Sequence, residues 1–408
     1  MTHHPTTDAR SCAYDLLIAG AGVAGIAAAL EAARAGLDVA LVEKTVLVGG
    51  LATTGLINIY LPLCDGRGHQ VIFGIAEELL HLSIKYGPGD VPPGWRDSPA
   101  KGEGQRYRTP FNPASFILAL DEALEEAGVD LWLDTLITRP LLEGDRVAGV
   151  VVENKSGSAT LRAKCVIDAT GDGDLAHRAG APCAEGDNWL CIWALQSSLE
   201  RAQRAVADPD GVSLLDRLNL GGSPGGAGHP EGLPPFRGTE GRQVTEFILG
   251  GRRMLRDHYV ERQALGGVND RRQLFPVTLP SMAQFRTTRR ILGREGMAGG
   301  EEGRYRDTSI GLTGDWRKAG PIWEIPYGAL VPTGVRGLLV AGRCVASEGD
   351  AWEVMRVIPP SALTGQVAGL AARLALASGR LPDELDVADI QEELGRMGIP
   401  YHAKQVAG

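Results

Sequence analysis

The residues with the clearest chemical purpose are a glycine turn near the start of the chain and an acid about twenty positions later. The turn reads G-x-G-x-x-G over residues 20–25, and the acid is Glu43. Gly20 permits a sharp turn, Gly22 lets the backbone approach a diphosphate, and Gly25 allows a helix to pack closely on a strand. Helix-start N–H groups favour the diphosphate charge, and a carboxylate suits ribose hydroxyls. The pattern therefore predicts a dinucleotide site.

The segments around the turn complete a βαβ unit. Residues 14–19 and 39–42 are apolar and predict buried strands, and residues 24–35 have the composition of a helix. Glu43 closes the second strand, where its charge would repel the extra phosphate of NADP. The full order of strand, turn, helix, strand and acid favours a nucleotide site over an ordinary glycine-rich turn.

Composition excludes several classes of protein. The chain has 408 residues, 44% of them hydrophobic, which suits about two domains. The net charge of -9 argues against nucleic acid or an anionic membrane as partner, and no apolar run is long enough to span a bilayer. The six cysteines include no C-x-x-C, and the first residues lack the apolar core of a signal peptide. We therefore expect a cytoplasmic protein without a redox disulfide and without a metal site.

The first half of the chain continues with helical and β patterns. Residues 71–86 and 112–128 predict helices, the second with Asn112 as N-cap and Pro113 in the first position. Short β-rich runs at 136–142, 147–153 and 160–163 predict a three-stranded antiparallel meander. A separate apolar strand follows at 164–169 and ends in the turn Thr170-Gly171-Asp172.

The second half changes character. Residues 182–305 show no alternation of strands and helices, although 244–265 and 282–293 have helical composition. The remaining predicted elements are a β segment at 322–331, a strand at 337–341, a helix at 359–377 and a polar tail after 381. We predict an α/β fold: a Rossmann-type domain with a parallel sheet and a β-meander, plus an inserted mixed α+β substrate domain.

Three stretches together carry a resemblance to a known family: residues 18–55, 166–181 and 325–369. They resemble the FAD-dependent oxidoreductase family of the glutathione-reductase-like superfamily, which shares a flavin domain with fumarate reductase flavoproteins and tRNA-modifying flavoproteins. The resemblance implies non-covalent FAD held by a discontinuous domain over 14–189 and 322–380. It leaves 190–321 as the substrate or cap domain, with 1–13 and 381–408 as peripheral tails.

The resemblance also implies which residues hold FAD. The glycine turn would line the pyrophosphate, Glu43 the ribose, and the helix after 359 would point its start at the flavin, where it stabilises negative charge. Many relatives have Gly-Asp where this chain has Gly342-Arg343. The implied cofactor-binding residues are Gly20, Ala21, Gly22, Val23, Ala24, Gly25, Glu43, Lys44, Gly50, Leu51, Ala52, Thr53, Ile137, Ala169, Thr170, Gly171, Gly342, Arg343, Ser361, Ala362 and Thr364.

Three residues are candidates for catalysis, each with a structural alternative. Arg356 precedes the flavin-directed helix and could bind a substrate carboxylate, or it could form a structural ion pair. Glu348 and His69 could act as bases, or they could be an ordinary surface acid and a loop histidine. Arginines over 286–290 and 304–306 could bind an anionic substrate or lie on a solvated helix face.

The resemblance implies an enzyme that oxidises a small organic substrate by hydride transfer to flavin N5. The expected partners are that substrate and oxygen, NAD(P)H or an electron-transfer partner. A flavin-dependent monooxygenase that uses NAD(P)H or a reductase is the first alternative. A non-catalytic or RNA-associated flavoprotein is the second, although the net acidity weighs against RNA.

Overall fold

The structure is a computed structural model that describes residues 11–91, 95, 108–223 and 225–406. Its centre is a mixed sheet in the order β5-β2-β1-β8-β7-β6, with β16 also paired to β8. The strands β5, β2, β1, β8 and β16 are parallel, and β6, β7 and β8 form an antiparallel meander. The predicted α/β fold is confirmed. The strands are β1 (Ser11–Ala19), β2 (Val39–Val42), β5 (Asp130–Trp132), β6 (Leu136–Glu143), β7 (Arg146–Asn154), β8 (Gly157–Asp168) and β16 (Leu338–Val340).

The meander differs from the prediction in one respect. The two strands expected at 160–163 and 164–169 are one continuous strand, β8. Its first half pairs with β7 and its last residues pair with β16, while β1 pairs with the other edge from Thr160 to Asp168. The neighbours of β8 change midway, but its backbone stays extended throughout. The composition of the sequence therefore led to a wrong prediction of two strands.

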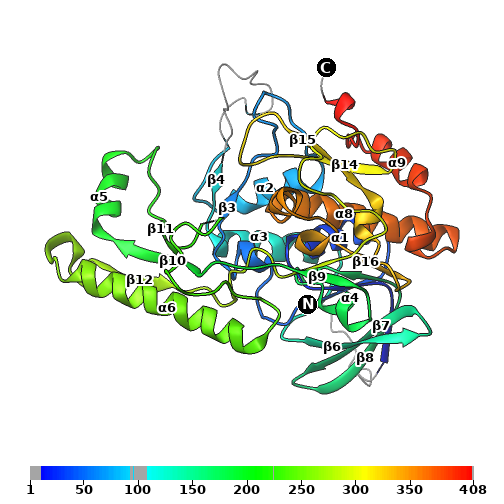
Figure 1. Cartoon of the computed structure of the whole chain (residues 1–408), viewed down its shortest axis with the longest axis horizontal. Helices are drawn as coiled ribbons and strands as arrows, with labels where there is room; N and C mark the ends of the chain where they lie inside the picture. Colours follow the sequence, from blue (N-terminus) through cyan, green and yellow to red (C-terminus); the bar gives the residue numbers. More distant parts are fainter. Residues whose placement is uncertain (1–10, 92–94, 96–107, 224, 407–408) are drawn as a thin grey trace.

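Two helices pack against each other on the sheet: α1 (Val23–Arg34) and α8 (Ile358–Ser378). They approach so closely that a Cβ at Gly365 would lie 2.0 Å from the carbonyl oxygen of Ala24, and one at Gly369 would lie 2.5 Å from that of Ala28. Glycine is therefore required at both places in α8. This contact brings the start of α8 to the start of α1, although they are far apart in sequence (Figure 1).

Further elements surround this pair. Asn112 accepts the Ala114 N–H at the start of α3, so the predicted N-cap is confirmed, whereas the helix expected from residue 71 begins only at Ile75. Ile390 and Leu394 of α9 are fully buried in the main core, although we placed 381–408 outside it. These elements are α2 (Ile75–Ile84), α3 (Pro113–Glu126), α4 (Asp174–Arg178), α7 (Asp350–Met355), α9 (Val387–Arg396), β3 (Ile59–Tyr60), β4 (Thr109–Pro110), β9 (Cys183–Glu185), β13 (Arg289–Ile291), β14 (Ser309–Gly314) and β15 (Ile322–Pro326).

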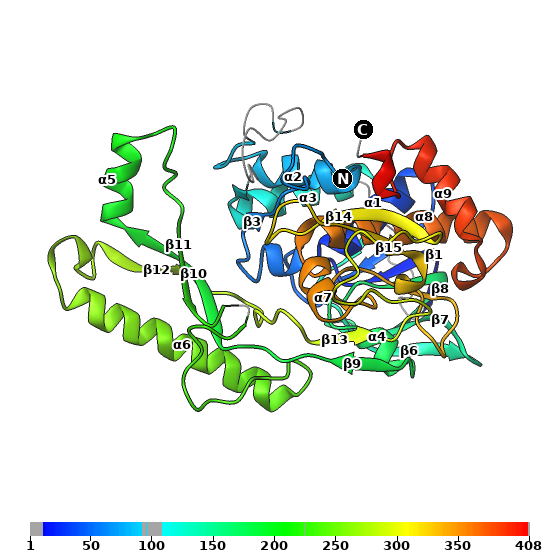
Figure 2. The same ribbon diagram turned by 45° about the horizontal axis from the view of Figure 1, so that its top comes forward.

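The middle of the chain forms an arm that stands off this body (Figures 1 and 2). We use the word arm for residues 191–278. It has a three-stranded antiparallel sheet in the order β11-β10-β12, so the expectation of no strand–helix alternation is wrong here. Ile192 and Ala194 of the sheet pack on Leu255 and Tyr259 of the long helix α6. The arm's elements are β10 (Cys191–Ser198), α5 (Leu199–Ala207), β11 (Asp216–Gly221), α6 (Gly241–Gln263) and β12 (Leu274–Thr278).

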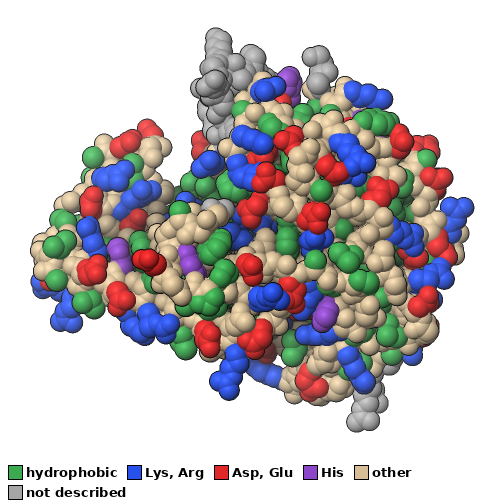
Figure 3. Space-filling view, in the orientation of Figure 1, with side chains coloured by type: hydrophobic (Ala, Val, Ile, Leu, Met, Phe, Trp, Pro, Cys, Tyr) green, Lys and Arg blue, Asp and Glu red, His purple; other side chains and the backbone are tan. Residues whose placement is uncertain are grey.

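The chain returns from the arm through an extended segment. Residues 282–293, predicted to be helical, contain no helix, and their end forms β13, which pairs with β9. The physical reason is that this segment uses its polar groups to bridge the arm and the body, as described below. In the space-filling view the surface is hollowed between arm and body (Figure 3).

Candidate functional site

The glycine turn between β1 and α1 has the geometry that a diphosphate needs. Gly20 has a positive φ of 98°, and a Cβ at Gly25 would lie 1.9 Å from the Gly20 carbonyl oxygen. Gly22 is different, because a Cβ there would meet nothing within 4 Å. Gly22 is also the N-cap of α1, and no side chain caps that helix. The first amides of α1 are thus directed at open space that a side chain would fill.

Glu43 holds this turn in place from the end of β2. Its Oε2 accepts the Ala21 N–H at 3.0 Å, and its Oε1 accepts the N–H and hydroxyl of Thr45 at 2.9 and 3.0 Å. The carboxylate is only 8% exposed. Because each carboxylate oxygen has two lone pairs, the group can still accept a ribose hydroxyl. Lys44, by contrast, has its side chain in solvent.

The loop after β2 returns to the glycine turn. The Gly49 N–H donates to the Ala21 carbonyl at 2.7 Å, and a Cβ at Gly50 would lie 3.0 Å from the Cα of Gly22. A short 3₁₀ turn (Gly50–Ala52) follows, closed by the Thr54 hydroxyl on the Gly50 carbonyl at 2.9 Å. The predicted residues Gly50, Leu51, Ala52 and Thr53 therefore lie beside the turn.

The second predicted turn, at the end of β8, lies over the first. The Ala169 N–H donates to the Ala19 carbonyl at 2.9 Å, and a Cβ at Gly20 would be 2.7 Å from the Ala169 carbonyl. Asp168 is fully buried beneath it and accepts hydrogen bonds from Thr170 and Ala176. Burial raises the pKa of Asp168, and these bonds oppose that rise.

The start of α8 completes the same region. The Gly342 N–H donates to the Thr364 hydroxyl at 3.0 Å, and a Cβ at Gly342 would lie 2.9 Å from that of Ala24 in α1. Ser361 and Ala362 are buried in the same turn of α8. The implied adenine-side residue, Ile137, lies farther along, on β6. The predicted cofactor segments thus converge from both ends of the chain, and the space left at Gly22 fits a diphosphate.

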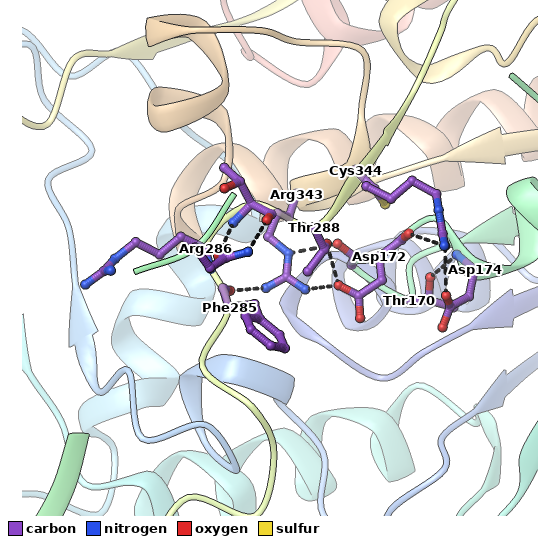
Figure 4. A network of polar contacts seen from close by, with 12 residues as sticks. Thr170, Asp172, Asp174, Phe285, Arg286, Thr288, Arg343 and Cys344 are labelled. Carbon is purple, nitrogen blue, oxygen red and sulfur yellow. Dashed lines mark hydrogen bonds and ion pairs between the residues drawn. The ribbon is translucent and has the colours of Figure 1, made fainter. Parts of the chain in front are cut away.

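Among the predicted cofactor residues, Arg343 has a side chain that is bound by several protein groups (Figure 4). Its guanidinium donates to the Gly171 carbonyl at 2.8 Å, to the Phe285 carbonyl at 2.7 Å and to Asp172. Asp172 also accepts the Thr288 hydroxyl at 2.6 Å. All three guanidinium nitrogens of Arg343 donate to protein groups, so this side chain joins the turn after β8 to the segment that returns from the arm.

The segment returning from the arm, residues 281–286, lies on the loop that follows Gly50. The Ser281 N–H donates to the Thr54 carbonyl at 2.9 Å, and the Gln284 amide donates to the Gly55 carbonyl. The Gln284 side-chain oxygen accepts the Trp193 N–H of β10 at 2.8 Å. Gln284 therefore joins the arm sheet to the loop. No sequence signal identified this segment apart from its arginines.

Three guanidinium groups gather where this segment meets α7 and α8: Arg286, Arg343 and Arg356. We call them the arginine cluster. Arg356 forms an ion pair with Glu353, and the Arg356 side chain is 12% exposed. Burial lowers the pKa of Arg356, Glu353 raises it, and the charges of Arg286 and Arg343 lower it again. The positive charges of Arg286 and Arg343 therefore act on Arg356.

The other two candidate catalytic residues have protein partners. His69 Nδ1 lies 3.0 Å from Asp65 Oδ2 in a loop where the His69 side chain is 43% exposed. Such a carboxylate can orient an imidazole for proton transfer. Glu348 forms an ion pair with Arg290 at 2.7 Å and is 59% exposed, which favours its structural role.

Comparison with known proteins identifies the group to which this site belongs. Residues 15–203 and 302–394, more than half of the chain, match the family described as FAD dependent oxidoreductase. The chain belongs to that family. FAD is therefore its cofactor, and the protein is an enzyme, an FAD-dependent oxidoreductase.

Individual relatives of this FAD-dependent oxidoreductase match only parts of it. A digeranylgeranylglycerophospholipid reductase of Picrophilus torridus is 31% identical over 163 residues, 39% of each chain. A thioredoxin reductase of Ureaplasma parvum is 41% identical over 71 residues, 17% of this chain and 23% of that one. A geranylgeranyl bacteriochlorophyll reductase-like structure from Thermoplasma acidophilum aligns with a TM-score of 0.46 and 17% identity, over 95% of this chain and 84% of that one. This oxidoreductase thus spans less than half the length of these two curated relatives.

Within the described residues, no helix of the FAD-dependent oxidoreductase combines the length and the apolar composition that a bilayer-spanning segment requires.

Proposed function

We propose that the protein oxidises a small organic substrate that binds between the arm and the loop after Gly50. The observation that carries this proposal is the segment 281–286, whose Ser281 and Gln284 bind the backbone of Thr54 and Gly55. That loop is a predicted flavin contact, so the segment returning from the arm covers the cofactor region at this point. Substrate sites commonly lie where two such units meet.

Bound FAD supplies hydride transfer, and the chain's own groups bind, orient and exclude water. The glycine turn and Glu43 hold the diphosphate and ribose. The start of α8 contributes the positive end of its helix dipole to the flavin region, since Pro359 and Pro360 in its first turn carry no N–H. Arg356 adds positive charge beside that helix start, which favours negative charge on the cofactor or substrate.

We assign proton transfer to His69. The His69–Asp65 pair is the candidate in which a carboxylate orients the ring, whereas Glu348 is held by Arg290.

We also propose that the chain is divided into a cofactor domain at 14–189 and 322–380 and a substrate domain at 190–321. Within the latter range, Ile310 and Leu312 of β14 lie in the main core.

The electron acceptor is oxygen or an electron-transfer partner, and the location is the cytoplasm. The names of the curated relatives include reductases, so the same site could run in the opposite direction with NAD(P)H as donor. Their similarity lies in less than half of this chain.

Anaerobic bleaching of the flavin tests the proposal. The holoenzyme is mixed without oxygen with a panel of amines, amino acids, hydroxy acids and sugars, and separately with NADH and NADPH. Loss of the yellow colour with an organic compound alone is the expected result. Bleaching by NAD(P)H only would contradict the oxidation and favour the reductase or monooxygenase alternative.

A further inference from the structure

The arginine cluster has more positive than negative charge. Arg343 is paired with Asp172 and Arg356 with Glu353, but no ion pair is formed by Arg286 among the described residues. The Arg286 side chain points away from the Arg343 network (Figure 4). Its charge lowers the pKa of the Cys191 thiol against the larger effect of burial, which raises it. A half-buried guanidinium without a carboxylate keeps donors available for an anionic ligand.

A second unpaired cation lies on the arm sheet. The Arg217 guanidinium stacks on the Trp193 ring, 4.7 Å from its centroid. One of its terminal nitrogens is buried and has no hydrogen-bond partner. Burial lowers the pKa of Arg217, and no nearby acid opposes that effect. This nitrogen is an unused donor in a desolvated place.

The two cations belong to one face of the sheet. Side chains alternate along a strand, so Cys191, Trp193 and Leu195 face away from Ile192 and Ala194, which pack on α6. Arg217 is the cross-strand partner of Leu195 and shares its face. Gln284, two residues before Arg286, bonds to both backbone groups of Trp193, which places Arg286 near the body end of this strand. Arg217 lies over the Trp193 side chain.

We propose that this face binds an organic anion, whose carboxylate or phosphate oxygens pair with Arg286 beside the flavin and whose body extends over Trp193 toward Arg217. The inference rests on the proposed function, because it names the substrate class for the same site. Guanidinium forks match the paired oxygens of both groups. The indole of Trp193 offers a flat apolar surface to the rest of the molecule.

Ligand binding to the holoenzyme tests this without turnover. The probes are benzoate, benzamide and phenyl phosphate, and the readout is the change in visible flavin absorbance during titration. We expect benzoate or phenyl phosphate to bind at least tenfold more tightly than benzamide. The stronger of the two anions decides between carboxylate and phosphate.

The variants Arg286→Gln and Arg217→Gln separate the two cations. Arg286→Gln should weaken anion binding about 10- to 100-fold and leave benzamide unchanged, while Arg286→Lys should restore part of the affinity. Arg217→Gln should weaken it about tenfold. Arg256→Gln, on the exposed side of α6, is the matched control and should bind as wild type. FAD content per protein shows whether each variant is folded.

Equal binding of acid and amide by the wild type, or wild-type anion affinity in Arg286→Gln, would overturn the inference. These outcomes do not depend on the proposed function. If anions bind through Arg286 and yet no organic compound bleaches the flavin, the oxidation is wrong and the anion site stands.

Discussion

Gly22 and Gly25 are three positions apart in one turn, and their missing side chains serve different purposes. At Gly25 the space is filled by the protein, since a Cβ would collide with the Gly20 carbonyl at 1.9 Å. At Gly22 the space is open, and its φ of -72° is one that any residue adopts. Gly25 therefore serves the fold, and Gly22 serves the ligand.

This difference predicts opposite results for two substitutions. Gly22→Val should leave the Tm of the FAD-free protein within about 2 °C of wild type and weaken FAD binding at least 100-fold, because the side chain fills the diphosphate space. Gly25→Val should lower the Tm strongly in the FAD-free protein. Thermal melts and flavin fluorescence titration measure both. A Gly22→Val protein that keeps its FAD would contradict the assignment.

Cysteine reactivity is a second property set by single residues. Burial raises the pKa of Cys165 to about 12, and it raises that of Cys344 well above its ordinary value. At pH 8 about one Cys165 thiol in ten thousand is then ionised. We expect at most the half-buried Cys12 and Cys183 to react with a thiol reagent in the folded protein, and all six in guanidinium. Four fast thiols before unfolding would be inconsistent with this burial.

Among the elements, the arm helix α6 is stabilised at its start by the side chain of its own N-cap residue. Its N-cap is Glu240, whose carboxylate accepts the N–H groups of Arg242 at 3.0 Å and Gln243 at 2.8 Å. These two bonds lower the pKa of Glu240 below its ordinary value. The ionised group therefore contributes stability at neutral pH, and this contribution is lost as the pH falls through the lowered pKa.

Replacing Glu240 with alanine should expose this contribution. We expect amide exchange at Arg242 and Gln243 to become about tenfold faster at pH 7, measured by hydrogen–deuterium exchange. The difference from wild type should shrink once the pH falls below about 4.3, the ordinary pKa of a glutamate, and disappear below the lowered pKa of Glu240, where the cap is protonated. Asp257→Ala, on an exposed turn of the same helix, serves as control. An effect that persists at pH 2.5 would show that charge is not the cause.

In the whole molecule, Gln284 is the side chain that couples the arm to the body. It is 4% exposed and bonds to Gly55 of the body and to both backbone groups of Trp193 in β10. On one edge of β10, pairing with β12 begins only at Leu195. Before that residue, the Gln284 side chain supplies the hydrogen-bond partner for this edge. Arm and body therefore share one buried amide.

Gln284→Ala should loosen this junction and cost about 2–3 kcal/mol, since it leaves buried backbone groups without partners. We expect faster hydrogen exchange at Trp193 and a lower kcat/KM for the substrate, with FAD affinity nearly unchanged. Gln263→Ala removes a bond to Leu274 inside the arm and is the matched control. Equal effects of both variants on kcat/KM would mean that the junction has no special role.

Much of the cofactor region was predictable because its requirements are local. A positive φ at Gly20, close packing at Gly25 and a helix start after Gly22 each leave a mark within a few residues, and Asn112 marks its own helix in the same way. The family match agrees with this reading.

Only the tertiary structure decided the rest, because it depends on contacts between distant segments. Gln284 and Gly55 are 229 positions apart, and the helix expected around Gln284 does not form since that stretch bridges two parts of the molecule. Whether an arginine is paired is equally non-local: Arg343 finds Asp172, whereas Arg286 and Arg217 find no acid among the described residues. Residue type determined that these side chains carry charge, and the packing of arm on body determined which charges are available to a ligand.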